Sequence, residues 1–222
     1  CTDTIIEVSQ TFPKPNASFV ATTHCLGDTL PLVNNSTSSA AVMYSWTFGD
    51  SFISSDSLPK HVYLTPNNYK VALTIMNSFS CSDDTSSIIN VAELPNVNYN
   101  FQNDCAGSSI QFYNQTTPTT GVSYAWNFGD NNFSASIAPA HTYTVDTSYF
   151  VTLVATSSSS CVDSSTKSIL IYPNPKANFI APDVCEGFPT VITNLSSIKS
   201  GTIVTNNWNF GDGNASLIQN PI

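Results

Sequence analysis

Cysteine is the residue whose spacing in this sequence points most directly to a chemical reaction. Six cysteines occur in 222 residues and fall into two series, each with steps of 80 residues. The first series is Cys25, Cys105 and Cys185, and the second is Cys1, Cys81 and Cys161. Because the sequence contains no Cys-x-x-Cys pair, the pattern argues against zinc and favours disulfides formed in an oxidising, extracellular setting.

Histidine recurs at the same interval and could support acid–base catalysis or metal binding. His61 in PKHVY returns as His141 in PAHTY, and each lies two residues before a tyrosine, Tyr63 or Tyr143. No Ser-His-Asp arrangement stands out, and the G-x-S-x-G motif does not occur. We therefore interpret these histidines as structural residues, packed and hydrogen-bonded at a strand turn, and we expect neither catalytic residues nor an enzyme.

Three aspartates follow a glycine at the same phase of the repeat. The pairs are Gly49-Asp50, Gly129-Asp130 and Gly211-Asp212. Clustered carboxylates bind calcium, but each of these aspartates lacks an adjacent acidic partner. A turn is the better interpretation, because glycine tolerates a positive φ and the carboxylate accepts backbone N–H groups of the turn. We expect no cofactor, with calcium as the alternative.

The segments that must position these residues also repeat along the chain. Trp46, Trp126 and Trp208 are the only tryptophans, and they lie 80 and 82 residues apart. Their surroundings are YSWTFGD, YAWNFGD and NNWNFGDG. A period of this length indicates a tandem array of similar structural units.

Proline-containing linkers set the expected domain boundaries. FPKP (12–15), ELPN (93–96) and YPNP (172–175) recur at one phase of the period. The expected domains are the C-terminal strand of a preceding repeat (1–12), two whole repeats (13–93 and 94–173) and the N-terminal part of a truncated repeat (174–222). Because both ends cut a repeat, we expect the chain to be an excerpt from a longer array.

Apolar residues form short, β-branched or aromatic runs that alternate with polar residues, which predicts an all-β fold. In 43–48 the alternation places Tyr44, Trp46 and Phe48 on one face. Strands are expected near 17–22, 29–35, 43–48, 52–54, 60–64, 69–77 and 86–91. About seven strands in such a unit are typical of a two-sheet sandwich. The expected core residues are Trp46, Trp126, Trp208, Phe48, Phe128 and Phe210.

W-x-F-G-D, followed 13 residues after the tryptophan by P-x-H-x-Y and then by Y-x-V-x-L, resembles the PKD (polycystic kidney disease) domain. The resemblance implies tandem immunoglobulin-like β-sandwiches arranged end to end. Ser51 and Asn131 stand where the family usually has the second glycine of GDG, which Gly213 keeps. The cysteine positions resemble PKD repeats of large Bacteroidetes surface proteins, including gliding-motility adhesins exported by type IX secretion.

Two disulfide pairings fit the cysteine series. Pairing within a repeat would join Cys25 to Cys81 and Cys105 to Cys161. An immunoglobulin-like strand order argues against this pairing, because it separates Cys25 and Cys81 by one strand length, ~23 Å. The Cα atoms of a disulfide lie only ~4–7 Å apart. The same order brings Cys161 near Cys25. Both pairings stay open, and Cys1 and Cys185 belong to truncated repeats.

Charge excludes one class of partner. Only 9% of the residues are charged, arginine is absent, and the formal net charge is −9. Nucleic acid is excluded because its phosphates would repel such a chain. No apolar run approaches the ~18 residues that a membrane span requires, so we expect no span in this segment.

These observations predict a structural stalk or filament segment of a large extracellular repeat adhesin, which spaces a binding region from the cell surface. The alternative is a spacer or carbohydrate-binding accessory module of a secreted hydrolase. Expected partners are neighbouring repeats of the same chain, other copies in a fibre, and glycans, on which tyrosines could stack. Three short motifs resemble the O-glycosylation signal of Bacteroidetes secreted proteins, with Thr4, Thr29 and Ser57 as acceptors.

Overall fold

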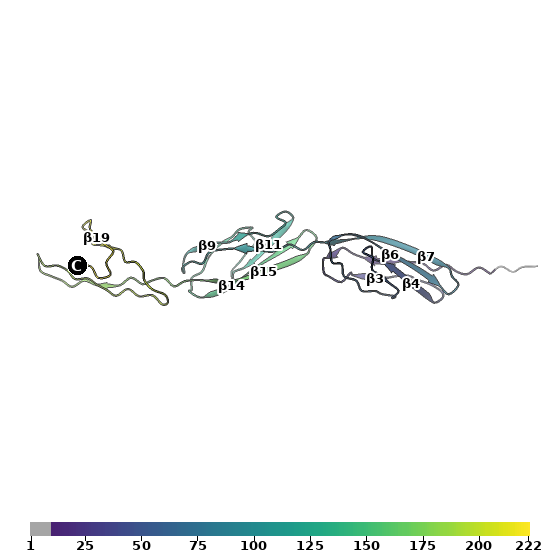
Figure 1. The fold of residues 1–222 in the computed structure, drawn as a ribbon, viewed down its shortest axis with the longest axis horizontal. Coiled ribbons are helices and arrows are strands. Elements are labelled where there is room, and N and C mark those ends of the chain that lie inside the picture. The colour runs from purple at the N-terminus through teal and green to yellow at the C-terminus, as the bar shows by residue number, and fades with distance from the viewer. Residues whose placement is uncertain (1–9) are drawn as a thin grey trace, which may run out of the picture. The chain divides into compact units, whose positions relative to one another are not determined.

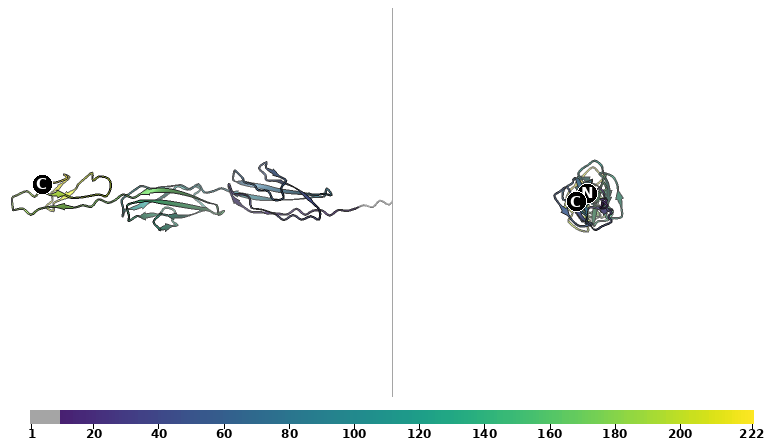
Figure 2. Two further views of the ribbon diagram at one scale, coloured as in Figure 1. Left: turned by 90° about the horizontal axis from the view of Figure 1, so that it is seen from below. Right: turned by 90° about the vertical axis from the view of Figure 1, so that its right-hand side faces the viewer.

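The computed structural model describes residues 10–222, and the regular elements in this part of the chain are β-strands (Figure 1 and Figure 2). The all-β class expected from the sequence is therefore confirmed. Of the strand expected over 1–12, residues 1–9 lie outside the described residues, as do Cys1 and Thr4, and residues 10–12 form no strand. We call the ranges 13–93, 94–173 and 174–222 repeats 1, 2 and 3.

Two compact units make up the chain. Unit 1 comprises the residues up to Asn96 together with two later segments, Thr117–Ser123 and Ala155–Asp163. Unit 2 comprises Val97–Thr116, Tyr124–Val154 and Ser164–Ile222. The division does not follow the sequence period, because Cys161 and the turn before it belong to unit 1 although they lie in repeat 2.

Repeat 1 is built around one five-stranded sheet. Its strand order is β2-β7-β6-β4-β5, in which the pair β2–β7 is parallel and the other pairs are antiparallel. A second sheet pairs β1 with β3. The strands are β1 (Phe19–Ala21), β2 (His24–Cys25), β3 (Leu32–Asn34), β4 (Val42–Thr47), β5 (Ile53–Ser54), β6 (Asn67–Asn77) and β7 (Ser82–Ala92).

The core of repeat 1 follows from alternation along β6 and β4. Every second residue of β6 from Tyr69 to Ile75 is buried. The β4–β6 register places Trp46 opposite Leu73, and both side chains are fully buried. Phe19 of the second sheet meets the indole of Trp46 edge-on, with ring centroids 5.3 Å apart. The tryptophan therefore lies at the centre of the core.

Two segments of repeat 1 differ from the sequence expectation. The strand expected near 60–64 is reduced to one bridge between Val62 and Thr29. The unexpected strand β2 pairs with the end of β7, with Cys25 opposite Ala92. A two-residue strand has no periodic pattern, so its pairing depends on contacts far apart in the sequence.

Repeat 2 has a similar arrangement of strands, but its larger sheet has four strands where that of repeat 1 has five. The order of its larger sheet is β12-β11-β14-β15, and the remaining strands form the pairs β13–β9 and β10–β8. β14 and β15 run side by side as the long hairpin (Figure 1). The strands are β8 (Tyr99–Asn100), β9 (Ser109–Gln111), β10 (Tyr113–Asn114), β11 (Val122–Asn127), β12 (Phe133–Ser134), β13 (Ala140–Thr142), β14 (Ser148–Ser157) and β15 (Val162–Leu170).

A buried tyrosine hydroxyl joins the pair β10–β8 to the larger sheet of repeat 2. Tyr99 of β8 donates a hydrogen bond to the carbonyl of Val151 in β14 at 2.6 Å and accepts one from the backbone N–H of Lys167 in β15 at 3.0 Å. Burial raises the pKa of Tyr99 to about 12. Its ring packs edge-on against Trp126, whose side chain is 1% exposed.

Repeat 3 corrects part of the core prediction. Trp208 is only half-buried and Phe210 is 38% exposed, so these two residues are not core residues as the sequence predicted. The reason is local, because residues 174–222 contain no counterparts of β14 and β15, which in repeat 2 lie beside β11 in the sheet that carries Trp126. The strands are β16 (Phe179–Ile180), β17 (Thr193–Asn194), β18 (Trp208–Asn209) and β19 (Ala215–Ser216).

The glycine of the Gly-Asp turn is required for two separate reasons in repeat 2. Gly129 has φ of 82°, and a Cβ atom there would lie 2.6 Å from the carbonyl oxygen of Phe150. Gly107 has a similar φ of 87°, but a Cβ atom there would meet nothing within 4 Å. Alanine substitutions at the two positions therefore distinguish the free-energy cost of the backbone conformation from that of a steric clash.

We expect Gly129→Ala to lower the free energy of unfolding by at least ~1 kcal/mol more than Gly107→Ala, because only the first adds overpacking to the left-handed backbone cost of ~1–2 kcal/mol. Urea denaturation followed by tryptophan fluorescence measures both values. Equal losses would show that the backbone at Phe150 moves away without cost.

Candidate functional site: turn clusters and a disulfide

The Gly-Asp turn of repeat 1 holds a histidine. One carboxylate oxygen of Asp50 accepts the backbone N–H of Phe52 at 3.1 Å, and the other accepts Nε2 of His61 at 2.8 Å. The imidazole is buried and packs against the ring of Phe48, with centroids 4.7 Å apart. The aspartate thus joins its own turn to the segment that carries His61.

Repeat 2 has the same cluster. Asp130 accepts the backbone N–H of Asn132 at 3.2 Å and Nε2 of His141 at 2.7 Å. Burial acts to raise the pKa of Asp130, but the hydrogen bonds from His141 and Asn132 outweigh it and hold this pKa below its usual value. His141 stacks on Phe128 at a centroid distance of 4.2 Å.

A tyrosine completes each cluster. The hydroxyl of Tyr63 donates to the carbonyl of Phe48, and that of Tyr143 donates to the carbonyl of Phe128, both at 2.9 Å. Both side chains are buried, and burial raises the pKa of each phenol. Each tyrosine therefore satisfies a backbone carbonyl inside the core.

The clusters offer no nucleophile. Within residues 10–222, the aspartate is the hydrogen-bond partner of each of these two imidazoles. In repeat 3 the backbone and side-chain N–H groups of Asn214 bind Asp212, each at 2.9 Å, and hold the pKa of that carboxyl below its usual value. The described part of the chain also has no group of three or more His, Cys, Asp or Glu residues that could hold a metal ion.

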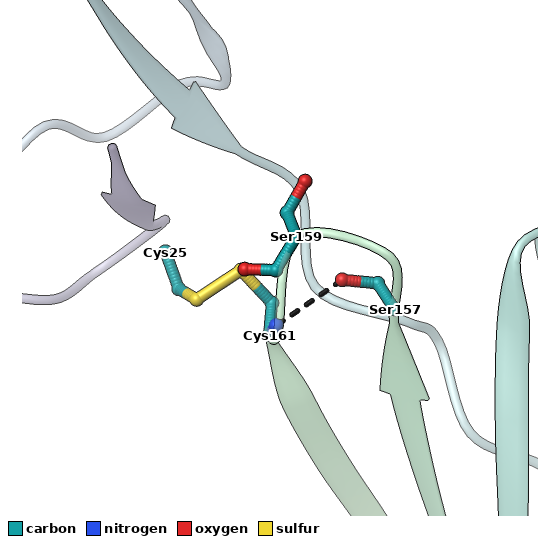
Figure 3. Close-up of a disulfide and its surroundings, with 4 residues drawn as sticks. All are labelled: Cys25, Ser157, Ser159 and Cys161. Atoms are coloured by element: carbon teal, nitrogen blue, oxygen red, sulfur yellow. Dashed lines mark hydrogen bonds between the residues drawn. A yellow bond between two sulfur atoms is a disulfide. The ribbon is translucent and has the colours of Figure 1, made fainter. Parts of the chain in front are cut away.

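The disulfide joins Cys25 to Cys161, with Cα atoms 5.6 Å apart (Figure 3). Both residues belong to unit 1, although Cys25 is in repeat 1 and Cys161 is in repeat 2. Of the two pairings open at the sequence level, the structure contains the one between repeats. The pairing within repeats is not formed, because Cys81 and Cys105 carry free thiols, as does the exposed Cys185.

Backbone hydrogen bonds fix the position of each cysteine of this disulfide. At Cys25, strand β2 lies parallel to the end of β7, and the N–H of Leu26 donates to the carbonyl of Ala92 at 2.9 Å. The chain then turns, with the N–H of Asp28 donating to the carbonyl of Cys25 at 3.1 Å and Gly27 at φ of 84°.

Cys161 follows the tight turn between β14 and β15. The N–H of Ser157 donates to the carbonyl of Cys161 at 2.8 Å, and the N–H of Cys161 donates to the side-chain oxygen of Ser157 at 3.1 Å (Figure 3). Ser160 takes a positive φ of 63° to close the turn. The sulfur therefore sits on a hairpin end with fixed backbone hydrogen bonds.

The disulfide closes a long loop. Its cysteines are 136 residues apart, and the chain-entropy model assigns about 5 kcal/mol to a loop of that size through restriction of the unfolded chain. The loop contains the proline linker ELPN and the strands β3 to β14. One bond thus restrains the unfolding of both repeats.

His24, next to the disulfide, was not singled out by the sequence. Its side chain is 9% exposed, and neither ring nitrogen has a hydrogen-bond partner in the described residues. The ring lies 5.8 Å from that of Tyr63. At this position repeat 2 has Asp104 and repeat 3 has Val184, so no repeated chemistry requires an imidazole there.

An open groove of about 490 Å³ lies in repeat 3. Its apolar lining includes Phe179, Ile192, Trp208 and Phe210. In repeat 2 the counterpart of this space is the buried core around Trp126, to which β14 contributes Val151 and Leu153. The groove therefore corresponds to the core of repeat 2.

Of the proposed glycosylation acceptors, Thr29 and Ser57 have exposed side chains. Their modification, and binding of glycans by this chain, stay predictions. No helix in the described residues is long and apolar enough to cross a membrane.

A family model for the PKD domain matches residues 13–92 and again residues 90–171. The chain belongs to the PKD domain family. Among solved structures, the PKD1 domain of Vibrio anguillarum Epp is 30% identical over 35% of this chain and 93% of its own, with a TM-score of 0.32. The PKD1 domain of the Vibrio cholerae metalloprotease PrtV is 29% identical over 35% of this chain and 96% of its own, also with a TM-score of 0.32.

An I-band fragment of titin is similar over a longer stretch, covering 90% of this chain and 86% of its own at 11% identity, with a TM-score of 0.39. The two PKD matches span the repeated tryptophan, Gly-Asp and His-Tyr motifs of repeats 1 and 2. Tandem PKD domains are typical of extracellular structural or spacer modules, and such domains are typically non-catalytic.

We expect Tyr143→Phe to lower the free energy of unfolding by ~1–2 kcal/mol, because it leaves the carbonyl of Phe128 buried without a partner. Tyr149→Phe is the matched control: its hydroxyl donates to the exposed carbonyl of Val145 at 3.2 Å, and water can replace it. The control should lose less than ~0.5 kcal/mol. Chemical denaturation measures both, and equal losses would contradict the role of the buried hydrogen bond.

Acid should weaken the Asp130 cluster. The pKa of Asp130 is lower in the folded chain than the ~3.9 of an unperturbed aspartate, so its ionised form stabilises the fold above that pH. This contribution is lost as the pH falls through the folded-state pKa. We expect Asp130→Asn to flatten the fall of the unfolding midpoint between about pH 5 and pH 3.

Asp163→Asn serves as the control for this titration, because Asp163 has no side-chain hydrogen bond among the described residues. Thermal unfolding followed by circular dichroism across the pH range gives the midpoints. If Asp130→Asn kept the full acid sensitivity while Asp163→Asn removed it, the assignment would be wrong.

Proposed function

We propose that this chain is a structural spacer segment of a large extracellular adhesin, and that the Cys25–Cys161 disulfide limits how far the segment extends under load. The cell surface is the proposed location, and a Bacteroidetes surface protein of the gliding-motility type is the proposed context, on the resemblance of the cysteine positions. Tandem PKD domains and a disulfide typical of extracellular proteins support the proposal.

The observation that carries the proposal is the place of the disulfide in the covalent chain. Tension applied to the two ends passes from Cys25 to Cys161 through the sulfur atoms, so the residues between them carry no load. These residues include β4, β6 and β7 of repeat 1 and β11 and β14 of repeat 2. Only short outer segments and β1, β15 and repeat 3 can extend.

The composition of the surface fits a passive spacer. Only 9% of the residues are charged, and the charge is net negative. Such a surface is rich in uncharged hydroxyl and amide groups, which keep it hydrated without strong Coulomb attraction to other molecules. The two imidazole–carboxylate pairs are held in structural clusters beside buried phenylalanines.

Single-molecule force spectroscopy tests the load path. When the oxidised chain is pulled from both ends, the contour length released on unfolding should be shorter by about 460 Å than for Cys25→Ser, because 136 residues at ~3.4 Å each stay inside the loop. Cys185→Ser removes an exposed free thiol and is the matched control. Equal contour lengths for the oxidised chain and Cys25→Ser would refute the proposed restraint.

A glycan array separates the structural role from that of a carbohydrate-binding module in a secreted hydrolase. For a spacer we expect no saturable binding of the intact chain to any polysaccharide on the array. Saturable binding to one polysaccharide would favour the hydrolase accessory module instead.

A further inference from the structure

We propose that Cys105 and Cys81 are the two halves of further disulfides of the same kind as Cys25–Cys161. Cys105 would bond to the hairpin cysteine of a PKD repeat that follows repeat 2 in tandem, and Cys81 to the Cys-x-Gly cysteine of one that precedes repeat 1. The inference extends the proposed spacer function, but its test is a disulfide assignment and does not depend on the response to force.

The backbone at Cys105 is the same as at Cys25. Cys105 forms a parallel bridge with Tyr172, as Cys25 does with Ala92 at the end of its own repeat. The N–H of Ala106 donates to the carbonyl of Tyr172 at 2.9 Å, and the N–H of Ser108 donates to the carbonyl of Cys105 at 3.1 Å. These two distances are equal to those of the corresponding bonds at Cys25.

The backbone at Cys81 is likewise the same as at Cys161. The N–H of Asn77 donates to the carbonyl of Cys81 at 2.9 Å, and the N–H of Cys81 donates to the side-chain oxygen of Asn77 at 3.1 Å. Ser80 has φ of 60°, close to the 63° of Ser160 in the other hairpin. Asn77 therefore replaces Ser157 and holds the cysteine in the same way.

Both thiols are partly exposed and unpaired in this chain. The backbone conformations that hold Cys25 and Cys161 in their disulfide therefore occur a second time, at Cys105 and Cys81, where the thiols are free. Cys185 of repeat 3 has the turn found at Cys25, since the N–H of Phe188 donates to its carbonyl at 3.1 Å and Gly187 has φ of 87°. The cysteine turn therefore recurs in the structure as well as in the sequence.

An ion pair within unit 2 shows that a following repeat reaches the part of repeat 2 that carries Cys105. Lys199 of repeat 3 binds Asp146 of repeat 2 at 2.8 Å. Lys199 is the counterpart of Thr119, which lies in the segment of repeat 2 that unit 1 includes. Gly107 beside Cys105 donates its N–H to the carbonyl of Tyr143, at the start of the loop that contains Asp146.

Formation of each bond is an ordinary thiol oxidation. The thiolate of one cysteine attacks a small-molecule disulfide such as oxidised glutathione and forms a mixed disulfide, with release of one small thiol. The second cysteine thiolate then displaces the other small thiol. Two protons and two electrons leave the protein thiols, and the small disulfide is reduced to two thiols.

An internally duplicated chain, residues 1–172 followed directly by 13–222, provides the test. Phe12 and Tyr172 occupy the same phase of the period, so the fusion places a complete repeat 1 after repeat 2 with the native linker spacing. After refolding in a glutathione buffer, non-reducing peptide mapping should find Cys105 of the first copy joined to Cys81 of the second, in addition to two Cys25–Cys161 bonds.

The unduplicated chain in the same buffer is the control. It should remain monomeric on a non-reducing gel and should yield no Cys81–Cys105 peptide. A disulfide-linked dimer through these residues would overturn the assignment to a tandem neighbour in favour of separate copies. If Cys105 of the first copy and Cys81 of the second copy were free in the duplicated chain while both Cys25–Cys161 bonds had formed, the proposal would be overturned.

A second variant distinguishes misfolding of the duplicated chain from failure of the proposed bond. With Cys25→Ser and Cys161→Ser in both copies, Cys105 and Cys81 lose their competitors, and circular dichroism reports whether the strands form. The Cys81–Cys105 bond should still appear in the folded variant. Its absence there would show that the two positions do not meet.

Discussion

Burial of the tryptophan in each whole repeat depends on the long β-hairpin that continues the sheet beside the tryptophan strand. Trp46 and Trp126 are almost completely buried in sheets that β6–β7 and β14–β15 extend, whereas Trp208 is half-exposed in a repeat without that hairpin. The short strands of repeat 3 and its Gly-Asp turn nevertheless form. Local turn chemistry therefore shapes the front half of the domain, and the hairpin supplies the apolar surface that closes the core.

The Asp–His–Tyr cluster fixes the turn that follows the tryptophan strand. In repeat 2 the aspartate binds the turn and His141, and Tyr143 binds the carbonyl of Phe128. These are polar groups at the edge of the core, each with its partner within the repeat. The cluster resembles catalytic chemistry in residue type, and its hydrogen bonds hold two segments of the repeat together.

Much of this arrangement could be predicted from the sequence. The all-β class, the PKD resemblance and the burial of Trp46 and Trp126 follow from alternation and period, because those signals are local and repeated. The contact between Asp50 and His61 could not be predicted, because it forms only when the fold brings the Gly-Asp turn next to the later segment that carries His61. The prediction that Phe210 lies in the core was wrong, because its motif carries no information about the hairpin that completes the core in repeats 1 and 2.

The sequence narrows the disulfide to two possible pairings but does not decide between them. Strand order placed Cys25 and Cys81 at opposite ends of a repeat, and the two-residue strand β2 that positions Cys25 has no sequence signal. The bond also changes what a protease can do to the chain. A single cut at any peptide bond between Cys25 and Cys161 leaves two fragments that stay covalently attached, so the segment survives a nick in any of its intervening loops.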